Sequence, residues 1–138
     1  MKEYFIICET DKTPYVVETD RGETDFLDFI HSHIDGFFEV VSPQNPEIKS
    51  RMGGMLILCD DEGLLKELPI NLVGSYLYGN TIVGNIIIGR HGYYKGTPDI
   101  VGYDSEEDAN RHCIAMATIR NVLQTSWDDS QQKKVKGV

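Results

Sequence analysis

The residues from Arg90 to Gly96 carry the strongest chemical signal in this sequence. The segment reads Arg-His-Gly-Tyr-Tyr-Lys-Gly and follows an apolar, β-branched stretch. It contains three potential cations and two aromatic rings, with glycines between and after them. An arginine donates two parallel hydrogen bonds to a phosphate, and a tyrosine ring stacks on a nucleobase. The pattern favours a site for an anionic aromatic ligand, while arginine and tyrosine are also ordinary residues of an exposed hairpin tip.

The candidate ligand-binding residues are all cationic or aromatic. Five lie in the glycine-rich segment, and three further arginines would be contributed by a loop and by the C-terminal helix, in part from a neighbouring subunit. They are Arg90, His91, Tyr93, Tyr94, Lys95, Arg51, Arg111 and Arg120. We expect their ligand to be a cyclic nucleotide or another phosphate-containing small molecule.

No motif for catalysis or metal binding occurs in the sequence, which lacks a phosphate-binding loop, a nucleophile elbow and an HExxH pattern. His31 and His33 are two residues apart on a predicted helix, so they point in different directions and are interpreted as surface histidines. The acids at 60–62 lack the spaced oxygen ligands of a calcium loop. We expect a binding protein with no catalytic residue, metal or cofactor.

The net charge of −9 is concentrated at the N-terminus, where residues 1–39 hold ten acidic residues against three basic ones. Such a face repels nucleic acid and anionic lipid, so direct binding to duplex DNA or to a membrane is disfavoured. An acidic surface also serves simply to keep a protein in solution.

The three cysteines, Cys8, Cys59 and Cys113, are odd in number, far apart and set in apolar segments. A disulfide framework or a zinc site would need closer partners, so we expect three buried, reduced thiols. Reduced thiols are typical of a cytosolic protein. The short apolar stretch after Met1 is closed by acids and resembles a first strand more than a signal peptide, so we expect a cytoplasmic location.

Alternating and helical apolar patterns predict an α+β fold with a mostly antiparallel sheet. Its helices are one near the N-terminus, one short helix and a C-terminal helix. Predicted strands cover residues 4–9, 15–19, 37–41, 55–59, 81–88 and 99–103, and predicted helices cover 25–34 and 69–79 and begin again at Ser105. Residues 42–54 are predicted as a loop, and residues 89–97 are predicted as a loop or a hairpin tip. Residues 1–126 form one domain, and the polar segment 127–138 is expected to be a disordered tail.

An ordered series of motifs resembles the phage- and plasmid-borne domain of unknown function 3846 family. The series comprises Phe38–Val41, residues 55–71 with their Glu-Gly and Leu-Pro-Ile-Asn elements, and Ile-Val-Gly followed by a second glycine at 82–89. The resemblance covers about residues 4–104, and Asn85 stands where such proteins often have aspartate or glycine. The family has no established catalytic residues, so the resemblance implies none. It implies a small protein of a mobile element, where anti-CRISPR and other anti-immune proteins also occur.

Two functional hypotheses follow for such a chain. The first is a non-catalytic sponge that counters bacterial immunity by sequestering a nucleotide signal, with its pocket at the interface of a homo-oligomer. The alternative is an acidic inhibitor that binds a host defence nuclease and blocks its nucleic-acid channel. A small hydrolase is a third possibility.

Overall fold

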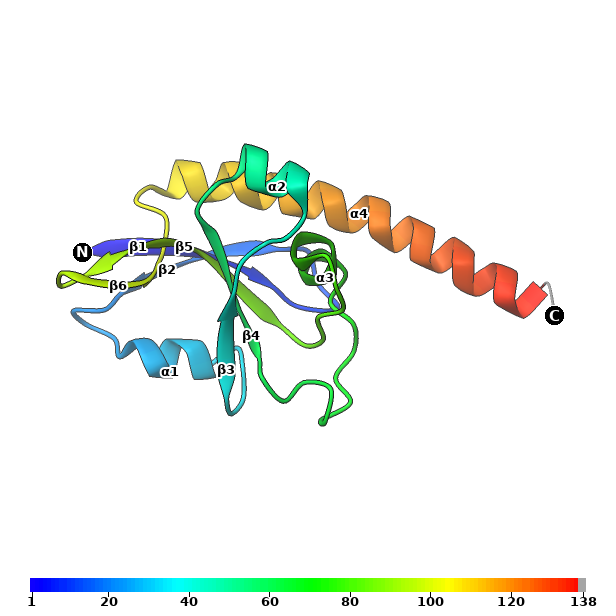
Figure 1. Cartoon of the computed structure of the whole chain (residues 1–138), viewed down its shortest axis with the longest axis horizontal. Helices are drawn as coiled ribbons and strands as arrows, with labels where there is room; N and C mark the ends of the chain where they lie inside the picture. The colour runs from blue at the N-terminus through cyan, green and yellow to red at the C-terminus, as the bar shows by residue number, and fades with distance from the viewer. Residues whose placement is uncertain (137–138) are drawn as a thin grey trace.

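A single antiparallel sheet forms the centre of the fold in the computed structural model, which describes residues 1–136 (Figure 1). The strands lie in the order β2-β1-β5-β4-β3, and β6 pairs with β5 outside this path. This arrangement confirms the predicted α+β class. The strands are β1 (Lys2–Cys8), β2 (Tyr15–Asp20), β3 (Phe38–Val41), β4 (Met55–Asp60), β5 (Ile86–Tyr94) and β6 (Thr97–Val101).

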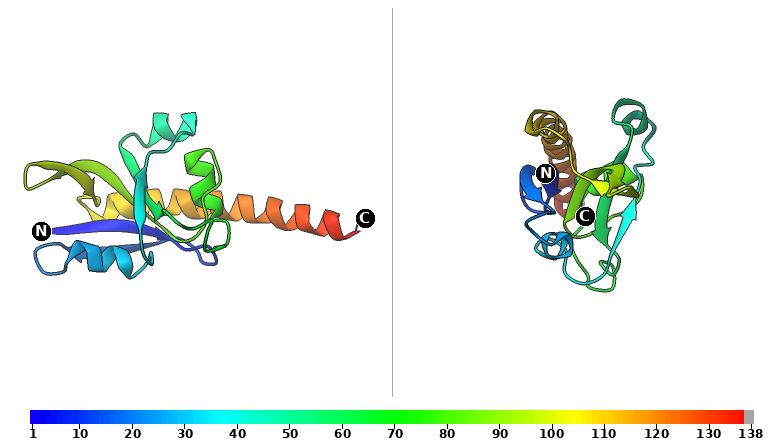
Figure 2. Two further views of the ribbon diagram at one scale, coloured as in Figure 1. Left: turned by 60° about the horizontal axis from the view of Figure 1, so that its bottom comes forward. Right: turned by 90° about the vertical axis from the view of Figure 1, so that its left-hand side faces the viewer.

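Helices cover both faces of the sheet (Figure 2). The core on one face joins residues of α2 (Pro46–Arg51), α3 (Leu72–Tyr78) and α4 (Glu106–Lys136) to the sheet, and the core on the other face joins α1 (Phe26–His31) to it. Alternation along the strands makes both cores possible, because successive side chains point to opposite faces. Ile86 and Ile88 of β5 belong to the first core, and Ile87 belongs to the second.

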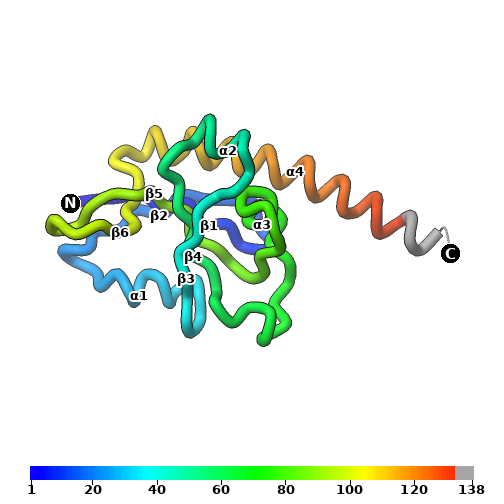
Figure 3. Tube along the Cα trace, viewed as in Figure 1, coloured from blue at the N-terminus to red at the C-terminus, as the bar shows by residue number. Residues whose placement is uncertain are grey.

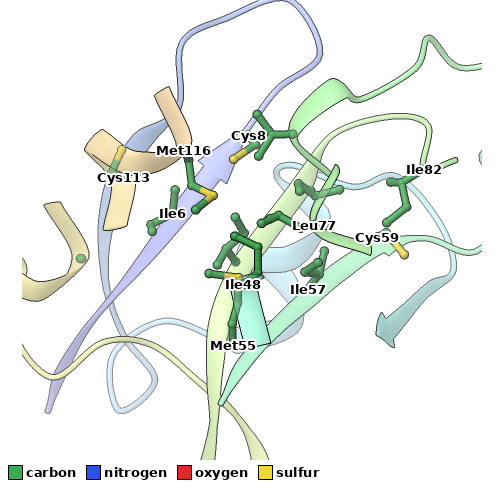
Figure 4. Packing of buried hydrophobic residues seen from close by; sticks show 14 of the residues in the cluster. Ile6, Cys8, Ile48, Met55, Ile57, Cys59, Leu77, Ile82, Cys113 and Met116 are labelled. Atoms are coloured by element: carbon green, nitrogen blue, oxygen red, sulfur yellow. The ribbon is translucent and has the colours of Figure 1, made fainter. Parts of the chain in front are cut away.

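All three cysteines are buried and free, as predicted. Figure 4 shows Cys8 and Cys113 beside Met116 in the core under α4. Burial raises the pKa of Cys8 and Cys113, and burial together with nearby carboxylates raises the pKa of Cys59 to about 12. The thiols therefore stay protonated near neutral pH and behave as small apolar side chains.

The segment predicted as a loop at 42–54 contains a helix, and the segment predicted as a loop or hairpin tip at 89–97 is mostly strand around a tight hairpin turn. Residues 46–51 form α2, whose start is capped by the Asn45 side chain with Pro46 in the first turn. Residues 90–94 continue β5, and Lys95 and Gly96 turn the chain into β6 with φ values of 50° and 79°. Two successive residues at positive φ are typical of the tightest hairpin turn.

The helix boundaries also differ from the prediction at three places. Asp25, and not Thr24, caps α1, and Asn71 caps α3, so Pro69 lies before that helix. The helix α4 runs to Lys136, so residues 127–136 are helical where a disordered tail was expected. Their sequence lacks apolar periodicity, but it also lacks glycine and proline and is rich in residues that tolerate a helix. Residues 137–138 of the expected tail lie outside the described residues.

Candidate functional site

Arg90 is separated from the other members of its segment because β5 is extended there. Successive residues of a strand point to opposite faces, so Arg90 and Tyr94 lie on one face of β5 and His91 and Tyr93 lie on the other. The Arg90 guanidinium lies 5.7 Å from the centre of the Tyr103 ring. Among the side chains that the structure describes, no ion pair involves Arg90. It is half-buried and remains available for an anion.

Tyr103 and His112 lie next to Arg90 and were not predicted as site residues. The Tyr103 hydroxyl lies 2.7 Å from Nδ1 of His112. Burial raises the pKa of Tyr103, while burial and the charges of Arg90 and Arg111 lower the pKa of His112. Both groups are therefore neutral near pH 7, and the ring nitrogen of His112 that carries the proton decides which of the two donates in this contact.

Tyr94 is held by a different cation. The Arg21 guanidinium lies 4.9 Å from the Tyr94 ring centre and 3.6 Å from that of Phe26, and its side chain is 4% exposed. It forms ion pairs with Glu3 at 2.7 Å and Asp99 at 2.9 Å. Because two carboxylates neutralise this arginine, it braces the hairpin and does not offer a free charge to a ligand.

His91 and Tyr93 contact each other, with ring centres 6.1 Å apart. His91 also lines a hollow of about 250 Å³ together with Lys49, Met52 and Met55. Of the described residues that line this hollow, none is acidic. Lys95 lies near the Tyr94 ring at the hairpin tip.

The remaining predicted arginines are dispersed. Arg51 is exposed on α2 and pairs with Glu47 at 3.4 Å. Arg111 is exposed on α4 and pairs with Asp108 at 3.1 Å. The charge of Arg120 acts on buried Cys8, on the core side of α4. Only Arg111 is linked to Arg90, since both charges act on His112.

Carboxylates gather in three hollows at the surface. The β2–α1 hollow measures about 410 Å³ and the β1–α1 hollow about 460 Å³, and each has four carboxylates and one lysine. The β3 groove measures about 340 Å³, and of the described residues that line it none is cationic. The carboxylates are Glu18, Asp20, Glu23 and Asp28 in the first, Glu9, Asp11, Asp35 and Asp60 in the second, and Glu39, Asp60, Asp61 and Glu62 in the third.

The Leu-Pro-Ile-Asn and Ile-Val-Gly motifs meet around one buried asparagine. Asn71 is 1% exposed, and its Nδ2 donates to the carbonyl oxygens of Cys8 and Gly84, each at 2.9 Å. Its Oδ1 accepts the backbone N–H of Gly74 and so caps α3. One side chain therefore ties together the end of β1, the segment just before β5 and the start of α3. This role is structural, and the motifs place no reactive group in a hollow.

Two further features limit the chemistry of the described residues. No three histidine, cysteine, aspartate or glutamate side chains among residues 1–136 converge as metal ligands would. No helix in that range has both the length and the apolar character needed to cross a membrane.

The fold and its surface define an α+β protein with acidic hollows, in which Asn71 links the sheet to α3. Residues 1–111 match the family described as a domain of unknown function (DUF3846), and the chain belongs to that family. The resemblance seen in the sequence is thereby confirmed. No curated protein and no solved structure matches the chain significantly.

Proposed function

We propose that this protein is a non-catalytic binding protein that inhibits a basic, nucleic-acid-binding protein of the host cytosol, such as a defence nuclease. The observation that carries the proposal is the excess of carboxylates over cations in the three acidic hollows. Carboxylates held at a surface offer a cationic channel the charge that a nucleic-acid backbone offers. The same charge opposes binding to duplex DNA or to an anionic membrane.

The arrangement of the hollows supports a broad contact surface. The helix α1 contributes Asp28 to the β2–α1 hollow and is followed by Asp35 in the β1–α1 hollow. Asp60 lines both the β1–α1 hollow and the β3 groove. The negative charge thus continues along α1 and around the end of β4. A partner with a long basic channel would contact several carboxylates at once, and this would set both its orientation and its association rate.

Competition with DNA tests the proposal. Purified defence nucleases bound to fluorescein-labelled duplex DNA would be titrated with the protein, and the anisotropy of the label would report displacement. We expect displacement from at least one nuclease, with an apparent affinity that falls as salt rises, because exposed charges are screened. Displacement independent of salt, or its absence across the panel, would contradict the proposal.

Sequestration of a nucleotide is a second candidate, and one observation favours it. Arg90 has no carboxylate partner among the described side chains, and the hollow beside Lys49 and His91 has no described acidic lining residue. Calorimetry against cyclic nucleotides tests this candidate. Arg90→Ala would weaken binding about thirtyfold or more if the guanidinium holds a phosphate, and Arg90→Lys would not restore it. Absence of heat with every nucleotide would exclude it.

A further inference from the structure

The β3 groove differs from the other acidic hollows because apolar side chains form much of its lining. Val41 on β3 and Tyr78, the last residue of α3, line it together with Ile82. The turn after β4 closes the remaining side, where Leu64 and Leu65 are 74% and 83% exposed. Figure 3 shows this turn projecting beyond the end of β4.

Exposed apolar side chains gather at this end of the sheet. Phe37 is 72% exposed, and its carbonyl oxygen accepts the backbone N–H of Asp61, so it is held beside the turn that carries Leu64 and Leu65. Burying a leucine is favourable by about 1.5–3 kcal/mol, and a contiguous exposed apolar patch is typical of an interaction surface.

The charge of the groove indicates which kind of partner segment would bind in it. Lys66 pairs with Asp60 at 2.8 Å, whereas Glu39, Asp61 and Glu62 form no ion pair with the side chains that the structure describes. Burial, and after it the negative charges of Glu39, Asp61 and Asp60, raises the pKa of the Cys59 thiol, so these carboxylates contribute a negative potential at the groove. An occupant must therefore bring positive charge, and the exposed leucines require apolar groups beside it.

We propose that the β3 groove docks a basic segment of a partner protein in which an arginine or lysine is flanked by apolar side chains. The cation would lie between Glu39 and Glu62, and the flanking side chains would cover Leu64 and Leu65. This inference rests on the proposed function and names the segment by which the inhibited protein is held. The apolar requirement distinguishes a protein partner from a free polyamine, which would satisfy the carboxylates alone.

A peptide titration tests the inference without knowledge of the partner. The probes are N-acetyl-Leu-Arg-Leu-amide, the matched Leu-Glu-Leu peptide and the matched Ser-Arg-Ser peptide, added to the 15N-labelled full chain. We expect the Leu-Arg-Leu peptide alone to give saturable amide shifts, centred on Cys59, Gly63 and Leu65. The paired substitution Leu64→Ser and Leu65→Ser should weaken this binding about tenfold.

Matched variants provide the controls. Asp61→Asn with Glu62→Gln should also weaken binding, whereas Glu47→Gln and Ile114→Ser, which change an exposed acid and an exposed apolar residue elsewhere, should leave it unchanged. Shifts centred on the β2–α1 hollow, equal binding of a control peptide, or shifts that do not saturate would overturn the inference. If the groove fails this test while the protein still displaces DNA from a nuclease, the proposed function stands and only the groove's role falls.

Discussion

The phenol oxygen of Tyr103 and Nδ1 of His112 lie 2.7 Å apart, and this contact joins the end of the sheet to α4. Tyr103 is anchored from the other side by a pair of backbone hydrogen bonds with Tyr4 of β1. The charges of Arg90, Arg111 and Asp108 all act on the imidazole. The contact therefore couples the position of α4 to the protonation of one histidine.

Stability should fall with acidification through His112. Burial and the two arginines lower its folded-state pKa below the ordinary 6.5, and the Asp108 charge opposes them only in part. As the pH falls through 6.5, the unfolded chain binds a proton at this residue before the folded chain does. The contribution of His112 to the free energy of unfolding is therefore fully present well above pH 6.5 and declines as the pH falls from 6.5 through the folded pKa. Urea unfolding of the wild type and His112→Gln between pH 5 and 8 measures this. Burial also lowers the pKa of His33, so the variant should flatten the slope without abolishing it. An unchanged slope would refute the assignment.

Removing the buried amide of Asn71 should destabilise the fold strongly. Asn71→Ala removes the hydrogen bonds to two carbonyl oxygens and to the Gly74 N–H, and we expect a loss of about 3 kcal/mol of unfolding free energy. Asn45→Ala removes the cap of α2, which lies nearer the surface, and should cost only about 1 kcal/mol. Urea unfolding monitored by circular dichroism compares them. Equal losses would show that the links to β1 and β5 contribute little.

The ion pairs of Arg21 give a third prediction. Arg21→Met leaves Glu3, which is largely buried, without its cation, so we expect a loss of about 3 kcal/mol. Arg21→Lys keeps the charge but cannot reach both carboxylates with one planar group, and it should recover only part of the loss. Thermal melts at neutral pH provide the measurement. Full recovery by lysine would mean that charge alone, without the guanidinium geometry, holds the hairpin.

Charge reversal should show where a basic partner binds. Glu18→Lys with Glu23→Lys changes the β2–α1 hollow, and Asp128→Lys with Asp129→Lys makes the same change in net charge on the exposed part of α4. We expect the first pair to reduce displacement of DNA from a sensitive nuclease at least tenfold and the second pair to have little effect. Similar losses in both would indicate a response to net charge alone. Melting curves confirm that each variant is folded.

The part of α4 that extends beyond the sheet leads to a prediction about oligomeric state. Figure 1 shows α4 extending well beyond the sheet, and Val122 and Trp127 are exposed there. We propose that a second copy covers these side chains in a homodimer, because an unsupported half-helix gains stability from tertiary packing. Light scattering at micromolar concentration should give twice the chain mass for the full protein and the single mass for a chain ended after Arg120. A monomeric full-length protein would contradict this.

The order of the elements was predicted from the sequence because apolar alternation and capping residues are local signals. The hairpin of β1 and β2, the strand β4 and the start of α4 all carry them. Local signals for α2 were also present, since Asn45 before Pro46 is typical of a helix start, but the glycines that follow made the stretch resemble a loop. The contact between Tyr103 and His112 left no such signal, because it depends on how the chain turns between β6 and α4.

The predicted ligand segment lies largely in a paired strand, where its glycines have a packing role. A Cβ on Gly89 would lie 2.7 Å from the Val101 carbonyl oxygen, and one on Gly92 would lie 2.5 Å from the Val101 side chain. Both glycines therefore allow β6 to lie close to β5, and they do not loosen the chain. The side chains of this strand segment point alternately to its two faces, so the predicted ligand-binding residues are distributed over both faces. Such a close approach of two strands cannot be recognised from a single sequence.

The central position of β5 has a consequence for synthesis of the chain. β5 pairs with β1 through Ile7 and Ile87 and with β4 through Leu58 and Ile87, so neither half of the sheet is joined to the other until residue 94 has left the ribosome. At about 5–20 residues per second, β1 waits roughly 4 to 17 seconds for this partner after its own synthesis. During that interval, its apolar edge is open to chaperones and to other nascent chains. The yield of folded protein should therefore depend on translation speed between β1 and β5 more than on any step after release.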